Sequence, residues 1–158
     1  MDVLGTTLSI IAITRNVVQY LSDVKSAGKE MQRLLVEVST TTGLLTALKT
    51  LAEVDEDWVQ TLQTLAKVDD SLITPGQRNP PKAPLDQMRE LLEELNRTLA
   101  PVKGIRKVGQ TVKWPFKKGD VQELLAKLGR LNNIFSFALQ HDHMWVHLQA
   151  YVSQIDFS

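Results

Sequence analysis

The sequence predicts an all-α protein: a multi-helix bundle built on four long helices, with the apolar N-terminal helix central and one or two short extra helices. Leucine dominates the apolar residues, while aromatic residues make up only 6% of the chain. The leucines recur at the spacing of three and four residues that marks one face of a helix. Because 158 residues form one domain, we expect residues 1–158 to be a single domain.

The first helix is expected from about Asp2 to Val24. Eleven of the 19 positions from Val3 to Leu21 are apolar, and Arg15 is the only charge between Val3 and Ser22. The polar remainder is a narrow strip made of Gly5, Ser9, Ala12, Asn16, Gln19 and Asp23. Such a helix must be buried nearly all round. Other helices of the protein can bury this helix, or lipid can bury it in a different conformational state of the protein. Both alternatives stay open.

This N-terminal stretch does not have the features of a signal peptide or of a constitutive transmembrane helix. Met1 is followed by an acidic residue, no basic segment precedes the apolar run, and no small-residue cleavage site follows it. A bilayer span needs about 20 predominantly apolar residues, whereas Thr, Ser, Asn, Gln and Arg interrupt this run. We therefore expect the protein to be soluble and cytoplasmic at rest.

A second helix should follow a short link at Ser26–Gly28. Its stripe is a heptad that consists of Met31, Leu34, Val38, Thr41, Leu45, Leu48 and Ala52. Next comes a short third helix that ends near Val68. Its first turn is acidic, which the helix dipole favours, and its buried face is Trp58, Leu62, Leu65 and Ala66. Asp55 is its expected N-cap, and Val54 with Val59 should form a hydrophobic staple.

Proline and glycine mark a loop from Asp69 to Pro84. Four of the six prolines fall there, with a turn signal at Pro75–Gly76. A fourth helix should then run from about Pro84 to Ala100 and stop at Pro101, because proline interrupts a helix. Its stripe is Leu85, Met88, Leu92, Leu95 and Leu99.

The last helix should open at Asp120, with Glu123 completing a capping box. Its stripe is Leu124, Leu128, Leu131, Phe135 and Ala138, continued by Trp145 and Val152. Before it lies a basic stretch, because seven bases and no acid occur from Arg97 to Lys118. From Glu53 to Asp70, in contrast, there are six acids and one base. The net charge of zero therefore conceals a bipolar molecule.

The basic stretch has three alternative interpretations. It can be a solvated positive patch, or it can bind anionic lipid as an interfacial amphipathic segment. The lipid-binding candidates are Lys103, Arg106, Lys107, Lys113, Lys117 and Lys118. Nucleic acid is the weakest alternative, since the net charge is zero and no stacking platform or recognition motif occurs. We expect no nucleic-acid partner.

No catalytic or cofactor motif is recognisable. The chain has no cysteine, which excludes disulfides and thiolate metal sites, and it has no glycine-rich phosphate loop. The three histidines are His141, His143 and His147. Two imidazoles on one helix face beside Asp142 could hold zinc, but a polar face at the end of the bundle explains them as well. We expect a non-enzymatic protein with no catalytic residue, no metal and no cofactor.

Four groups of residues resemble one known family. The first is Met1–Leu4 with Ser9–Ala12, and the second is Tyr20–Lys25 with Arg33–Val38. The third is Pro84–Leu85 with Leu91–Leu95, and the fourth is Lys113–Lys118 with Val121–Leu125 and Leu139–His143. Together they are similar to the fungal N-terminal domain of STAND (NOD-like, NACHT-type) receptors, the HeLo-like class. The resemblance covers essentially the whole chain.

This resemblance implies a helical bundle at the N-terminus of a longer receptor, with downstream nucleotide-binding domains as partners in cis. It also implies a cell-death effector that forms a homo-oligomer on activation, moves to the plasma membrane and permeabilises it through the N-terminal helix. Anionic membrane lipid would then be a partner. The membrane-insertion candidates are Val3, Leu4, Leu8, Ile10, Ile11, Ile13, Val17, Val18 and Leu21. A plain interaction module, which self-associates or recruits a partner without membrane activity, stays open as the alternative.

Overall fold

The computed structural model confirms the all-α multi-helix bundle. It describes residues 2–23, 28–67, 76, 82–104 and 116–140, with backbone only for 100–104. The described part consists of α1 (Val3–Asp23), α2 (Lys29–Val54), α3 (Glu56–Ala66), α4 (Pro84–Gly104) and α5 (Lys118–Gln140). Four of these helices have 21 to 26 residues and α3 has 11, so the predicted set of four long helices and a short one is confirmed.

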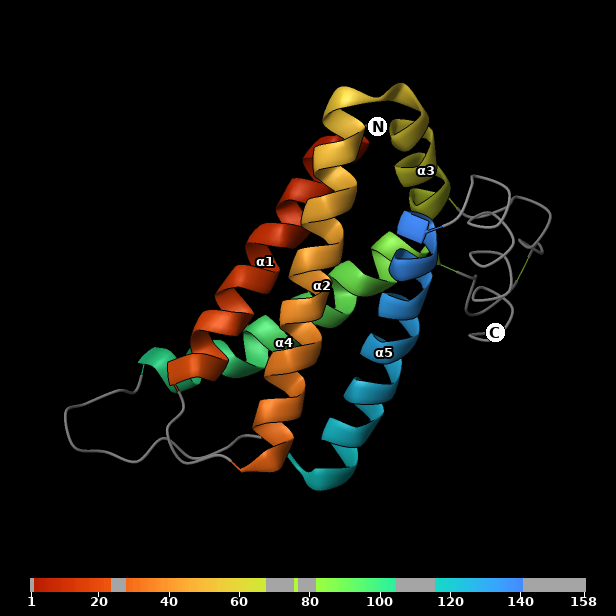
Figure 1. The fold of residues 1–158 in the computed structure, drawn as a ribbon. Coiled ribbons are helices and arrows are strands. Elements are labelled where there is room, and N and C mark those ends of the chain that lie inside the picture. The colour runs from red at the N-terminus through yellow and green to blue at the C-terminus, as the bar shows by residue number, and fades with distance from the viewer. Residues whose placement is uncertain (1, 24–27, 68–75, 77–81, 105–115, 141–158) are drawn as a thin grey trace.

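Helix α2 lies between α1 and α5 and makes its most extensive contacts with both (Figure 1). Helix α1 runs antiparallel to α2, whereas α5 runs parallel to it, so α2 and α5 begin at the same end of the bundle. Helix α3 folds back beside the end of α2, and α4 crosses at a steep angle and packs mainly on α1. Helix α1, which was expected to be central, shares the middle of the bundle with α2, because it lies between α2 and α4 and also contacts α3.

Helix α1 buries one face and exposes the other. Its buried residues are Val3, Thr7, Ile10, Ile11, Thr14, Val17 and Leu21, at helical spacing. The opposite face is exposed and includes Ser9, Ala12, Asn16 and Gln19 of the predicted polar strip, together with Leu8 and Arg15. Burial nearly all round is therefore wrong: a polar strip with a charge stays in water, since burying it without partners costs free energy.

The predicted stripes form the core. In α2, Leu34, Val38, Thr41, Leu45, Leu48 and Ala52 are buried, and in α4 all five predicted stripe residues are buried. In α5, Leu128, Leu131, Phe135 and Ala138 are buried, and Leu124 is half-buried. The heptad and leucine periods therefore predicted the helix phases correctly.

The helix ends were predicted less well. The side chain of Asp55 accepts a hydrogen bond from the Asp57 amide at 2.9 Å, which confirms the N-cap of α3. The staple is wrong, because Val54 is 81% exposed and is not covered by Val59. Helix α4 does not stop at Pro101 but continues to Gly104. A proline at this place gives up its own bond to the carbonyl four residues earlier and crowds that carbonyl, and the helix continues past Pro101 in spite of this cost.

The start of α5 also differs from the prediction. The helix begins at Lys118, and the Val121 amide donates to the Lys117 carbonyl at 3.2 Å. Asp120 therefore lies inside the first turn, where the dipole still favours an acid, and the capping box is wrong. Gly76 has a φ of 83° within a turn, which supports the predicted turn signal. Trp145, Val152 and the three histidines lie outside the described residues.

Replacing a stripe leucine with alanine should destabilise the bundle. Leu45, Leu92 and Leu128 are each 0% exposed, and Leu→Ala at such positions costs about 2–5 kcal/mol. Chemical denaturation monitored by circular dichroism would measure this loss. The control is Leu8→Ala, which removes a side chain that is 48% exposed and should cost much less. Equal losses for all four variants would contradict the observed helix phases.

Candidate functional site

The nine membrane-insertion candidates are mostly covered by the bundle. Five of them, Val3, Ile10, Ile11, Val17 and Leu21, are at most 5% exposed. Leu4, Ile13 and Val18 are half-buried against the same core. Leu8 is the exception, since it is 48% exposed on the outer face of α1. The apolar surface of α1 is therefore occupied mainly by α2 and α4, the two helices that it contacts most extensively.

The buried hydroxyl groups of α1 are satisfied within α1 itself. Thr7 Oγ1 donates to the Val3 carbonyl at 2.7 Å, and Thr14 Oγ1 donates to the Ile11 carbonyl at 2.6 Å. Neither hydroxyl depends on a neighbouring helix for this hydrogen bond. Such internal bonds would persist in any environment in which α1 stays helical, including one without water.

Helix α1 also carries its own N-terminal cap. The Gly5 amide donates to Asp2 Oδ1 at 3.1 Å, which satisfies one of the free amides of the first turn. A Cβ atom at Gly5 would lie 2.5 Å from Asp2 Oδ2, so the absence of a side chain there allows the cap to approach. The local sequence thus supports helix α1 without help from tertiary contacts.

The burial of α1 sets a free-energy scale for its release. Fully burying an aliphatic side chain contributes about 1.5–3 kcal/mol. The five α1 side chains that are at most 5% exposed therefore contribute about 7–15 kcal/mol together. This range is similar to the whole unfolding free energy of a typical domain, about 5–15 kcal/mol. Helix α1 cannot leave the bundle unless another environment buries the same side chains.

Two of the six lipid-binding candidates lie in the described part of the chain with their side chains. Lys117 and Lys118 are exposed at the start of α5. The other four candidates cannot be placed in this way: Arg106, Lys107 and Lys113 lie outside the described residues, and so does the side chain of Lys103. The structure adds two exposed cations at the same end of the bundle, Lys29 and Arg33 at the start of α2. Sequence reasoning missed them, because only the parallel packing of α2 and α5 brings these positions together.

Lys29 and Arg33 belong to an open groove between α2 and α5, here called the basic groove. Its volume is about 560 Å³, and its lining is Lys29, Gln32, Arg33, Val36, Glu37 and Leu125. Val36 is 61% exposed and lies among these charges. The groove therefore offers two cations beside an apolar surface.

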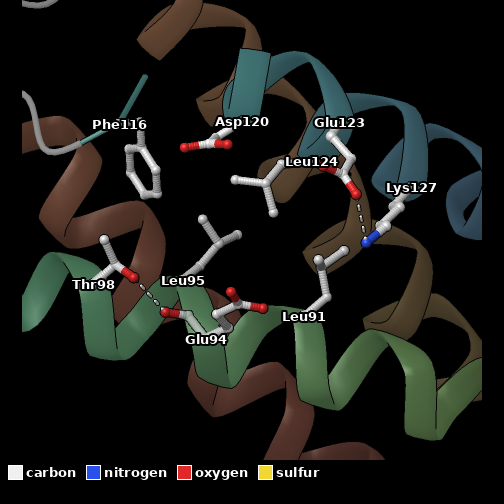
Figure 2. Close-up of a pocket in the computed structure, with 9 residues that line it drawn as sticks. All are labelled: Leu91, Glu94, Leu95, Thr98, Phe116, Asp120, Glu123, Leu124 and Lys127. Atoms are coloured by element: carbon white, nitrogen blue, oxygen red, sulfur yellow. Dashed lines mark hydrogen bonds and ion pairs between the residues drawn. The ribbon is translucent and has the colours of Figure 1, made fainter. Parts of the chain in front are cut away.

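A second hollow, here called the acidic pocket, lies between α4 and α5 (Figure 2). Its volume is about 270 Å³, and its lining is Leu91, Glu94, Leu95, Thr98, Phe116, Asp120, Glu123, Leu124 and Lys127. Lys127 Nζ lies 3.2 Å from Glu123 Oε1. Among the residues that the structure describes, no ion pair joins Glu94 or Asp120. The pocket thus combines a leucine floor with a mainly acidic rim.

A buried polar cluster joins the two helices that carry the basic groove. Thr41 Oγ1 on α2 donates to Asn132 Oδ1 on α5 at 2.7 Å. Asn132 Nδ2 in turn donates to the Glu37 carbonyl at 3.1 Å and to Glu37 Oε2 at 3.0 Å. Asn132 is only 5% exposed. The heptad placed Thr41 in the core, but nothing in the sequence indicated Asn132 as its partner.

The described part of the chain contains neither a metal-binding cluster nor a membrane span. No group of three histidine, cysteine or acidic residues there could hold a metal ion. The histidines that could hold zinc according to the sequence lie outside that part. No described helix is long and apolar enough to cross a membrane.

Removing the Asn132 amide should destabilise the contact between α2 and α5. Asn132→Ala removes the hydrogen bonds of Asn132 to Thr41 Oγ1 and to Glu37, each worth about 0.5–1.5 kcal/mol, although Thr41 Oγ1 keeps the Glu37 carbonyl at 3.0 Å. The matched control is Asn133→Ala at the adjacent exposed position, which should change the unfolding free energy by less than about 0.5 kcal/mol. Similar losses in both variants, measured by chemical denaturation, would show that the polar cluster contributes nothing specific.

Comparison of this chain with protein-family models, with curated proteins and with solved structures finds no match. The fold class therefore rests on the structure. The HeLo-like resemblance remains a prediction from the residues, and the function is inferred from the surfaces described above.

Proposed function

We propose that this chain is a non-enzymatic effector domain that targets and permeabilises membrane through α1 when it is activated. The observation that supports this proposal most strongly is the character of α1. Its apolar side chains are buried by other helices, while its two buried hydroxyls and its N-terminal cap are satisfied within Asp2–Asp23. On this buried face, apolar burial is the main contribution that would have to be replaced if α1 moved into lipid, and acyl chains provide it.

The magnitudes favour a regulated release. Leaving the bundle would cost about 7–15 kcal/mol in lost apolar burial, so the resting state keeps α1 packed. Burial of the same side chains in lipid would return most of this free energy. Arg15 opposes deep insertion, because a charge at the bilayer centre costs about 2.5–3.5 kcal/mol. We therefore expect activation to require clustering of several copies at the membrane, in agreement with an N-terminal domain of a larger receptor.

Membrane targeting is assigned to the basic stretch. Lys117 and Lys118 are exposed and face solvent at one end of the bundle. A cation near an anionic surface contributes about 1 kcal/mol. The six candidate cations together would therefore concentrate the domain at a membrane rich in anionic lipid and leave it unattached to a neutral one.

Binding to vesicles should depend on this charge. The variant in which Lys103, Arg106, Lys107, Lys113, Lys117 and Lys118 are all changed to glutamine should sediment with phosphatidylserine vesicles at least about tenfold less than the unchanged chain. Added salt should weaken the binding of the unchanged chain, because it screens exposed charges. Equal binding to neutral and anionic vesicles would remove the electrostatic part of the proposal.

The role of α1 is best tested at Leu8, which is 48% exposed and so is nearly dispensable for packing. Leu8→Glu should change stability little, since exposed positions tolerate substitution within about 0.5 kcal/mol. In lipid, however, the new carboxylate would cost about 2.5–3.5 kcal/mol, so dye release from vesicles should fall several-fold. Arg15→Leu should preserve or increase release. The assay clusters the chain on anionic vesicles through a C-terminal histidine tag and a nickel-chelating lipid.

The matched control is Val54→Glu, which introduces the same charge at a residue of α2 that is 81% exposed. It should leave dye release unchanged. Release that is indifferent to Leu8→Glu and Arg15→Leu would mean that α1 is only a structural element of the bundle. If the clustered, unchanged chain causes no release from anionic vesicles, the membrane proposal fails.

The second candidate function is an interaction module without membrane activity. The observation that favours it is the presence of two hollows of opposite charge beside α5, the basic groove and the acidic pocket. Surfaces of this kind are typical of contacts between proteins, where complementary charge determines orientation and partner. Self-association without dye release would favour this function.

A further inference from the structure

Helix α5 forms part of both hollows. Leu124 lines the acidic pocket and Leu125 lines the basic groove. Consecutive residues of a helix point about 100° apart, so the two hollows open on different sides of α5. Occupation of one therefore does not block the other.

Four of the exposed charges of the two hollows have no ion-pair partner within the described part of the chain, whereas Glu123 and Lys127 of the acidic pocket pair with each other at 3.2 Å. No ion pair there joins Lys29 or Arg33 in the basic groove, nor Glu94 or Asp120 in the acidic pocket. Each hollow also has apolar residues between its charges, including Val36 in the groove and a leucine floor in the pocket. Apolar surface beside unpaired charge is the composition expected of a surface that another molecule covers.

We propose that the basic groove of one copy docks on the acidic pocket of a second copy, so that the chain assembles head to tail. Lys29 and Arg33 would face Glu94, Asp120 and Glu123, and Val36 would contact the leucine floor. Because the contact joins two different surfaces, it leaves one free groove and one free pocket at the ends of every open assembly. Such heterologous contacts produce a ring or a filament.

Each hollow contains one charge opposite in sign to its other charges. These two charges favour a second copy of the chain over an anionic lipid as the occupant of the basic groove. Glu37 lines the basic groove and would repel an anionic headgroup. The acidic pocket contains one cation, Lys127, which can lie opposite that carboxylate. Each surface therefore contains one charge opposite in sign to its other charges, although Lys127 pairs with Glu123 and Glu37 accepts from Asn132 within one copy. This inference goes beyond the proposed membrane function, since assembly needs neither lipid nor the release of α1.

Charge reversal tests the proposal with the full chain. In sedimentation velocity up to about 1 mM, a range that detects weak association, the unchanged chain should form larger species with increasing concentration. Lys29→Glu with Arg33→Glu should weaken association at least about tenfold, and so should Glu94→Lys with Glu123→Lys, because like charges then face each other. A mixture of the two variants should associate again, because the groove of one variant is now acidic and the pocket of the other is now basic. The chain that carries all four changes should also associate.

The control is Arg15→Glu with Lys49→Glu, which makes the same change in net charge on residues outside both hollows and should associate as the unchanged chain does. Circular dichroism would verify that each variant folds. Because the chain has no cysteine, Arg33→Cys and Glu94→Cys provide a second readout. A disulfide dimer should form rapidly in the mixture of these two variants and slowly in either alone.

Three outcomes would overturn the proposal. One is an unchanged chain that stays monomeric at about 1 mM, and another is failure of the mixed reversal variants to associate. The third is a basic-groove variant that loses binding to phosphatidylserine vesicles while its self-association is unaffected, which would assign the groove to anionic lipid. None of these results depends on dye release, so the membrane proposal would stand or fall separately.

Discussion

The whole bundle depends on covering the apolar stripe of α2 on two sides. The buried heptad of this helix runs from Leu34 to Ala52, and no single neighbour can cover it. Helix α1 packs on one side and α5 on the other, which places α2 in the middle of the molecule. Helix α4 then closes the far side of α1. Burial of apolar surface supplies most of the free energy that holds such an arrangement together, so the loss of any one long helix would expose the stripes of the others.

This dependence gives α1 two opposing properties. It is essential to the core, because most of its apolar residues are buried, and yet its two buried hydroxyls, those of Thr7 and Thr14, bond to carbonyls of α1 itself. The contacts that attach the buried apolar side chains of α1 to the bundle are therefore non-directional. An attachment of that kind holds tightly in water and weakens in lipid, where the hydrophobic driving force is absent. The proposed switch between a soluble bundle and a membrane-active state uses this difference between the two solvents.

Helix α5 is held differently. Asn132 bonds to Thr41 and Glu37 in the interior, and such directional bonds specify how two helices lie along each other. The parallel pairing of α2 and α5 brings Lys29 and Arg33 to the same end as Lys117 and Lys118. It also forms the basic groove, to which α5 contributes Leu125, while the neighbouring Leu124 lines the acidic pocket. If α5 stays in place while α1 is released, the chain could still assemble through the two hollows beside α5 when α1 lies in the membrane.

The fold class, the four long helices, the buried faces of α2, α4 and α5 and the Asp55 cap could be predicted from the residues alone, because these follow from the periodicity and local chemistry of contiguous residues. It predicted wrongly where α4 and α5 begin or end around Pro101 and Asp120, since helix ends respond to small local energies. The packing between helices determined that α2 lies between α1 and α5, that Asn132 meets Thr41, and that Lys29 and Glu94 line two hollows beside one helix. These relations join residues far apart in the chain. They depend on which face of each helix packs against which neighbour. An apolar stripe does not specify which helix will cover it, because hydrophobic burial is non-directional.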